Sequence, residues 1–142
     1  MAFSGSFAQL TKLKAKLEKL PEAIPEIKRE VALEVGTIME REFSEGVSPT
    51  GEPWAKLADS TLAKGRTPPP LTASGNMRGK TSVLPTVKGV TVRVPGPASF
   101  HQYGTKKMPA RPLLPESGTS LPSRWQEPIE AIGLKVLRAK LK

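Results

Sequence analysis

Apolar residues recur at helical spacing near the start of the chain. Positions three and four residues apart lie on one face of an α-helix, so this spacing predicts an amphipathic helix. Such a face is more often a core or an inter-subunit seam than a membrane-binding surface, and this one lacks tryptophan among its anchors. The stripe comprises Phe7, Leu10, Leu13, Leu17 and Leu20.

A second and longer helix is predicted over residues 22–45. Pro21 and Pro25 suit its first turn, where proline is tolerated, and Gly46 is a natural stop. The expected buried face consists of Ile24, Ile27, Val31, Val35, Ile38 and Phe43. The opposite face carries Glu26, Lys28, Arg29, Glu30, Glu34, Glu40 and Arg41.

Residues 46–81 lose this periodicity and are rich in Gly, Pro, Ser and Thr, which predicts an extended loop or arm. The triple proline at 68–70 favours an extended polyproline conformation. A short helix is expected over residues 58–64, and residues 71–77 are expected to lead into another helical turn. A loop of this length in a compact domain is usually functional or disordered.

Apolar and polar residues alternate strictly over residues 90–94, in place of the helical spacing seen earlier in the chain. Val90, Val92 and Val94 alternate with polar residues, which predicts a strand over 90–95 paired with another over 82–87. Lys88-Gly89 suits the hairpin turn, and Pro85 indicates an edge strand or a bulge. Residues 100–103 form another short element, and a proline-rich arm ends near residue 115.

A last helix is expected from Ser123, its N-cap, to Lys140, with Pro128 late in the first turn or at a kink. Its apolar side carries Trp125, Ile129, Ile132, Val136 and Leu137. The predicted fold class is α+β: N-terminal helices, a small antiparallel sheet with long Pro/Gly-rich loops, and a C-terminal helix. All 142 residues are expected to form a single domain, with regions 1–45, 46–81, 82–115 and 122–142.

Composition excludes most catalytic chemistry. The chain has no cysteine, one histidine (His101), no Gly-x-Ser-x-Gly elbow and no phosphate loop, and its acidic residues lack metal-ligand spacing. We therefore expect no enzyme, no catalytic residue, no cofactor and no metal. No apolar run reaches membrane-spanning length and the N-terminus lacks a signal peptide, so we expect a soluble protein made in a cytoplasm, with no membrane partner.

Positive charge is unevenly placed along the chain. The net charge is +9, with −1 over residues 1–45, +5 over 46–104 and +5 over 105–142. Such a field favours polyanions or acidic protein surfaces, although a solvated basic surface is the plain alternative.

Two segments fixed by Pro and Gly, residues 48–57 and 108–115, are candidates for docking against neighbouring proteins, since rigid segments dock with little ordering cost. Trp54 either anchors an interface or plugs the domain core, and Arg111 either binds a partner carboxylate or pairs with a glutamate of the second helix. If both are interface anchors, their alanine variants fold yet fail to assemble. The candidate interface residues are Pro49, Gly51, Pro53, Trp54, His101, Tyr103, Gly104, Pro109, Arg111 and Pro112.

In this order and spacing, these segments resemble the virion morphogenesis or tail-completion family of tailed bacteriophages. The resemblance comprises Phe43, residues 49–57, Thr61 with Lys64, residues 71–77, residues 90–94, residues 101–105 and residues 109–114. The family often has an aromatic residue where Leu113 stands, and the first 40 residues match only as a helix before the motif.

The resemblance implies a structural protein of the phage head–tail junction, with no reaction. Small α+β subunits would form a homo-oligomeric ring, sixfold or twelvefold, next to connector or adaptor, tail terminator or tail tube proteins. Non-specific contact with DNA in the channel is expected. The protein itself is expected at the head–tail junction of the virion and, during assembly, in the host cytoplasm. The charge supports one alternative, a small basic nucleic-acid-binding protein, against which stands an aromatic content of only 5%.

Overall fold

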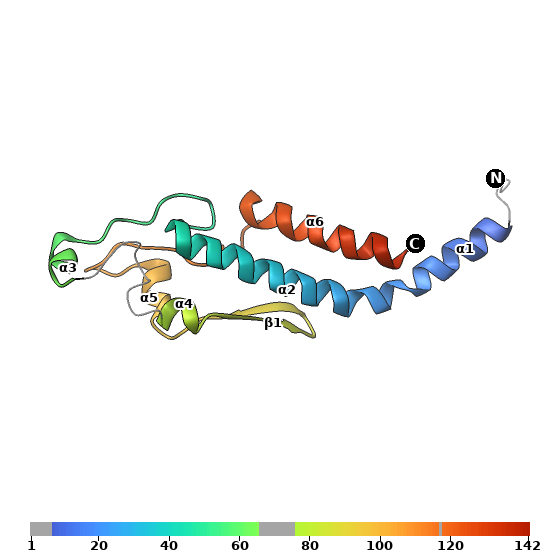
Figure 1. The fold of residues 1–142 in the computed structure, drawn as a ribbon, viewed down its shortest axis with the longest axis horizontal. Helices are drawn as coiled ribbons and strands as arrows, with labels where there is room; N and C mark the ends of the chain where they lie inside the picture. The colour runs from blue at the N-terminus through green and yellow to red at the C-terminus, as the bar shows by residue number, and fades with distance from the viewer. Residues whose placement is uncertain (1–6, 66–75, 117) are drawn as a thin grey trace.

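A long central helix, α2 (Leu20–Glu45), organises the fold (Figure 1). The computed structural model describes residues 7–65, 76–116 and 118–142, so the triple proline and residues 71–75 of the predicted arm lie outside the described residues. The helix begins two residues before the predicted start and ends as predicted at Gly46, whose left-handed φ of 67° lets its N–H bond to the Glu42 carbonyl at 2.8 Å.

Helix α6 (Ser123–Lys140) lies antiparallel to α2 along one side (Figure 1). Ion pairs join the two helices near both ends, Arg124–Glu45 at 2.9 Å and Lys140–Glu26 at 3.1 Å. The shared core between them consists of Val35, Ile38, Met39 and Trp125. The predicted range of α6 is confirmed, but its N-cap is Pro122 rather than Ser123, and no side-chain hydrogen bond caps it.

The hairpin of β1 (Ser82–Thr86) and β2 (Gly89–Arg93) packs on the other side of α2 (Figure 1). The strands are antiparallel, with Val83 opposite Val92 and Pro85 opposite Val90. Both strands of a two-stranded sheet are edges, so the missing N–H of Pro85 is tolerated. With helices before and after this small antiparallel sheet, the predicted α+β class is confirmed.

Helix α1 (Phe7–Glu18) extends α2 beyond the ends of α6 and the hairpin (Figure 1). Leu13 is 53% exposed and Leu17 is 54% exposed, so within the described residues the chain does not bury the predicted stripe in its own core. The side chains of Phe7 and Leu10 lie outside the described residues. Ile24, placed by prediction on the buried face of α2, is 49% exposed, so that assignment is wrong.

At the opposite end of the molecule lie three short helices, α3 (Asp59–Ala63), α4 (Asn76–Gly79) and α5 (Ala98–Tyr103), with the hairpin between α4 and α5 in the chain (Figure 1). The short elements expected near residues 58–64, 77 and 100–103 are therefore confirmed. Arg78 of α4 binds Glu40 at 2.7 Å and the Ser44 hydroxyl at 2.8 Å, which fastens this helix to α2. A second core cluster sits here, comprising Phe43, Trp54, Ala98 and Leu113.

Candidate functional site at the loop end

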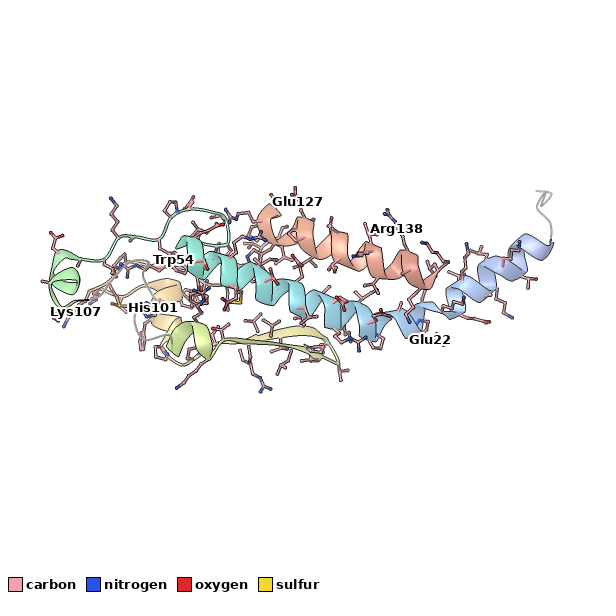
Figure 2. The ribbon with its side chains drawn as sticks, in the orientation of Figure 1. Glu22, Trp54, His101, Lys107, Glu127 and Arg138 are labelled. Atoms are coloured by element: carbon pink, nitrogen blue, oxygen red, sulfur yellow. The ribbon has the colours of Figure 1, made fainter. Side chains whose placement is uncertain are left out.

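The predicted docking segments converge at one end of α2. We call this region, residues 46–58 and 95–116, the loop end. Gly51 has φ 91° and makes the turn that closes the first segment, with Ser48 N–H bonded to the Glu52 carbonyl at 2.8 Å. Trp54 N–H then returns to the Gly46 carbonyl at 2.8 Å, so the segment folds back onto the end of α2. Trp54, His101 and Lys107 mark this end of the molecule in Figure 2.

Trp54 lies in the core of its own chain, which was one of the two roles left open by the sequence. Its residue exposure is 5%, and its ring meets Phe43 edge-on at a centroid distance of 6.0 Å. The indole N–H donates to the Pro112 carbonyl at 2.8 Å, so it joins residues 58 positions apart in the chain. A buried indole with a satisfied N–H contributes packing and a specific orientation together.

Arg111 is likewise buried within the chain, at 7% exposure. Its guanidinium donates to two backbone carbonyls, through Nε to Ala55 at 2.8 Å and through a terminal nitrogen to Lys56 at 2.9 Å. The alternative of an ion pair with a glutamate of α2 is therefore wrong. The fork of donors instead satisfies carbonyls that a loop leaves without ladder partners, and burial lowers the pKa of Arg111.

Gln102 lies in the 101–105 motif, but the sequence analysis gave it no role of its own. Its Nε2 donates to the Leu114 carbonyl at 2.7 Å, while Oε1 accepts the N–H groups of Leu113 and Leu114 at 2.8 and 2.9 Å. The primary amide thus substitutes for a neighbouring strand along the proline-rich arm. Nothing in the local sequence distinguishes this glutamine from a solvent-exposed one.

His101 and Gly104 hold the arm from α5. The His101 carbonyl accepts Arg111 N–H at 2.6 Å, and burial, with a smaller contribution from the Arg111 charge, lowers the pKa of the imidazole. Gly104 has φ 74°, and a Cβ there would lie 2.8 Å from the backbone nitrogen of Ala110. The arm passes so close to Gly104 that no side chain fits between them.

The converging segments leave a hollow of about 560 Å³, and five of the sixteen residues that line it are prolines. Tyr103 stands at its edge with 77% of its surface exposed, and Pro53 and Pro109 are exposed as well. Candidates at this hollow are Pro49, Pro53, Trp54, Tyr103 and Pro112. The structure therefore brings the sequence-predicted residues together, with Trp54 and Arg111 inside and Tyr103 outside.

A buried carboxyl between α2 and α6 was also missed. Glu42 is 2% exposed; its Oε1 accepts the Trp125 indole N–H, and its Oε2 finds no partner among the described residues. Burial raises the pKa of Glu42 to about 8, against smaller lowering effects of the Trp125 bond and the Arg124 charge. Its place four residues after Ile38 put it on the buried face, and this is the signal that could have found it.

The next two features concern metal binding and membrane crossing. Across residues 7–65, 76–116 and 118–142, no three His, Asp or Glu side chains gather closely enough to hold a metal ion. Within the same part of the chain, no helix is both long and apolar enough to cross a bilayer. Comparison with protein-family models, with curated proteins and with solved structures gave no match.

Proposed function

We propose that this chain is a structural subunit of a phage head–tail junction, assembling into a ring that completes the neck or tail and helps to join head and tail around the DNA channel. The proposal extends the sequence resemblance. It involves no reaction, so the proposed role depends on the contacts that the protein surface makes with neighbouring proteins.

One observation carries the proposal: the separate segments that bear the resemblance interlock in space. Residues 49–57 meet residues 109–114 through Trp54 and Arg111, and residues 101–105 meet the same arm through His101 and Gly104. Each segment thus contributes a different part of one folded unit. That unit presents an exposed Tyr103 and a hollow lined by five prolines together with polar residues, and a surface held in shape by proline suits contacts between subunits because little ordering is needed.

The test is electron microscopy of particles from the phage or prophage that encodes the chain, together with mass photometry of the purified protein. We expect a closed oligomer, formed alone or on mixing with connector and tail-tube proteins, and density for it at the neck. Particles made without the gene should accumulate as unjoined heads and tails. A protein that stays monomeric in every mixture and is absent from purified particles would overturn the proposal.

The alternative, a small nucleic-acid-binding protein, is favoured by exposed lysines at the loop end. Lys106 and Lys107 occupy the turn between Thr105 and Met108, and Lys56 is also exposed. A ring subunit needs only weak DNA contact, whereas a dedicated binder holds DNA tightly at moderate salt with a steep salt dependence. Measuring affinity for duplex DNA between 50 and 200 mM salt (about the range over which counterion release is resolved) separates the two. Lys106→Glu with Lys107→Glu should lower the slope by about 2 only for a dedicated binder.

A further inference from the structure

Helix α1 carries an apolar ridge with a basic edge. Leu13 and Leu17 form the ridge, each more than half exposed, on a helix that projects past the rest of the molecule (Figure 1). At about 100° per residue, Lys12 and Lys16 lie one turn apart along one edge of this ridge. Neither lysine forms an ion pair within the described residues.

Charge argues against two α1 ridges pairing with each other. The helix has three lysines and one glutamate, and Lys19 follows directly. Bringing two such helices together would place lysine rows side by side, which is destabilising. The ridge calls for an apolar surface with acidic neighbours.

Helix α2 offers that surface. It contains seven glutamates against Lys28, Arg29 and Arg41, in a chain whose net charge is +9. On its solvent face Leu33 is 64% exposed. Helical spacing places Glu30 and Glu34 one turn apart on one side of Leu33, in the same i, i+4 relation as Lys12 and Lys16.

On the other side of Leu33 lies a hollow of about 450 Å³. Its lining includes Ala32, Gly36 and Met39, and a Cβ placed on Gly36 would meet nothing within 4 Å. Of the cations on this face, Arg78 is held by Glu40 and Ser44, while Arg29 lies one turn before Leu33 and is exposed. The hollow is open and largely apolar, with room for leucine side chains.

The ridge cannot reach the hollow of its own chain. Both lie on nearly continuous helix, and the 16 residues from Leu17 to Leu33 span about 24 Å. We propose that α1 of one copy docks on α2 of the next, with Leu13 and Leu17 beside Leu33 over the hollow and Lys12 and Lys16 facing Glu30 and Glu34. The contact joins two different surfaces, so it is heterologous and closes into a ring when the rotation permits. It rests on the proposed ring assembly and names one of its contacts.

The first experiment removes the ridge. Leu13→Ser with Leu17→Ser should leave a folded chain, because both side chains are exposed, and circular dichroism checks this. By mass photometry, the protein concentration needed for assembly should rise about 100-fold above that of the wild type, because the contact no longer buries the apolar area of two leucines. Ala15→Ser, on the opposite face of α1, is the matched control and should assemble normally.

The second experiment exchanges the charges. Lys12→Glu with Lys16→Glu, and separately Glu30→Lys with Glu34→Lys, should each abolish assembly. An equal mixture of the two variants should assemble again, as should one chain carrying all four substitutions, because each acidic ridge then meets a basic face. Lys88→Glu with Lys135→Glu makes the same change in charge at two exposed positions outside α1, the Leu33 face and the loop end, and should leave assembly intact.

The outcomes separate this contact from the proposed function. An oligomer that survives both the ridge and the single-sided charge variants shows that the contact is wrong, while the ring itself stands. A wild type that is monomeric in all mixtures overturns both. Restored assembly in the mixture, with no density at the neck of purified particles, supports the contact and removes the head–tail assignment.

Discussion

At the loop end the backbone is irregular but the side chains are buried, whereas at the α1 end the backbone is regular but the apolar side chains are half exposed. Trp54 and Leu113 are 5% and 1% exposed, against 53% and 54% for Leu13 and Leu17. A helix satisfies its own backbone groups, so its hydrogen bonds do not depend on a buried face. A loop has no such ladder, and here Trp54, Arg111 and Gln102 supply the missing partners. Irregular structure is therefore the part that depends most on individual side chains.

The largest expected effect comes from removing the centre of the loop end. Trp54→Ala leaves a cavity beside Phe43 and an unpaired Pro112 carbonyl, and should lower the free energy of unfolding by about 3–5 kcal/mol. Urea denaturation followed by circular dichroism measures this. Trp54→Phe keeps most of the ring and loses the N–H, so its cost should be clearly smaller. Native stability in Trp54→Ala would show that the core assignment is mistaken.

Between the two ends, the helix pair α2–α6 should respond to pH through Glu42. The folded carboxyl keeps its proton up to about pH 8, whereas the unfolded one releases it near the ordinary value of 4.5. The unfolded state thus binds fewer protons in this window, and the free energy of unfolding falls as pH rises through it, by at most ~1.4 kcal/mol per pH unit. Below 4.5 this contribution is fully present, and above about 8 the loss is complete.

Glu42→Gln removes that titration while its amide oxygen still accepts the Trp125 N–H. Its stability should therefore change less than that of the wild type across this window, and it should exceed the wild type near pH 8. Urea denaturation at a series of pH values gives both curves. Parallel curves throughout would mean that Glu42 titrates normally in the folded protein.

Replacing a glycine by alanine should destabilise the protein at the loop end and stabilise it in helix α6. Gly104→Ala forces a Cβ against the Ala110 backbone at a left-handed φ, at a cost of about 2–3 kcal/mol. In α6, a Cβ on Gly133 would meet Ile27 at an ordinary 3.9 Å, so Gly133→Ala should stabilise by about 0.5–1 kcal/mol. Thermal unfolding of both variants should show shifts in opposite directions, and equal shifts would remove the contrast.

The smallest effect on stability is expected at the exposed ridge. Leu17→Ser should change the free energy of unfolding by less than about 0.5 kcal/mol, because the side chain already contacts solvent. A loss above about 2 kcal/mol, of the size seen for core truncations, would show that α1 folds back onto the body of the chain in solution.

Elements were predictable where periodicity was long. Helix α6 and the end of α2 at Gly46 follow from apolar spacing and a glycine stop, and the hairpin follows from alternating valines around Lys88-Gly89. These signals depend on residues that are close together in the chain, so they can be read from the sequence alone.

The directions of single large side chains were not predictable in the same way. Tryptophan and arginine serve equally in cores and in interfaces, so the sequence left Trp54 and Arg111 open until the distances to Pro112 and Ala55 placed them inside. Ile24 shows the converse limit: it has the spacing of a buried residue, yet it is 49% exposed while the adjacent Ala23 is fully buried.

The bond between Trp125 and Glu42 spans 83 residues, and it has a consequence for synthesis. Helix α6 is the last element to be synthesised, so it leaves the ribosome after α2, the helix that it covers. At about 5–20 residues per second, the interval between α2 and Trp125 lasts roughly 4–16 s. Throughout that interval the face of α2 that carries Val35, Ile38 and Met39 lacks its final cover on the newborn chain. Chaperones that hold exposed apolar helices therefore have several seconds in which to bind this protein before α6 can pack on α2.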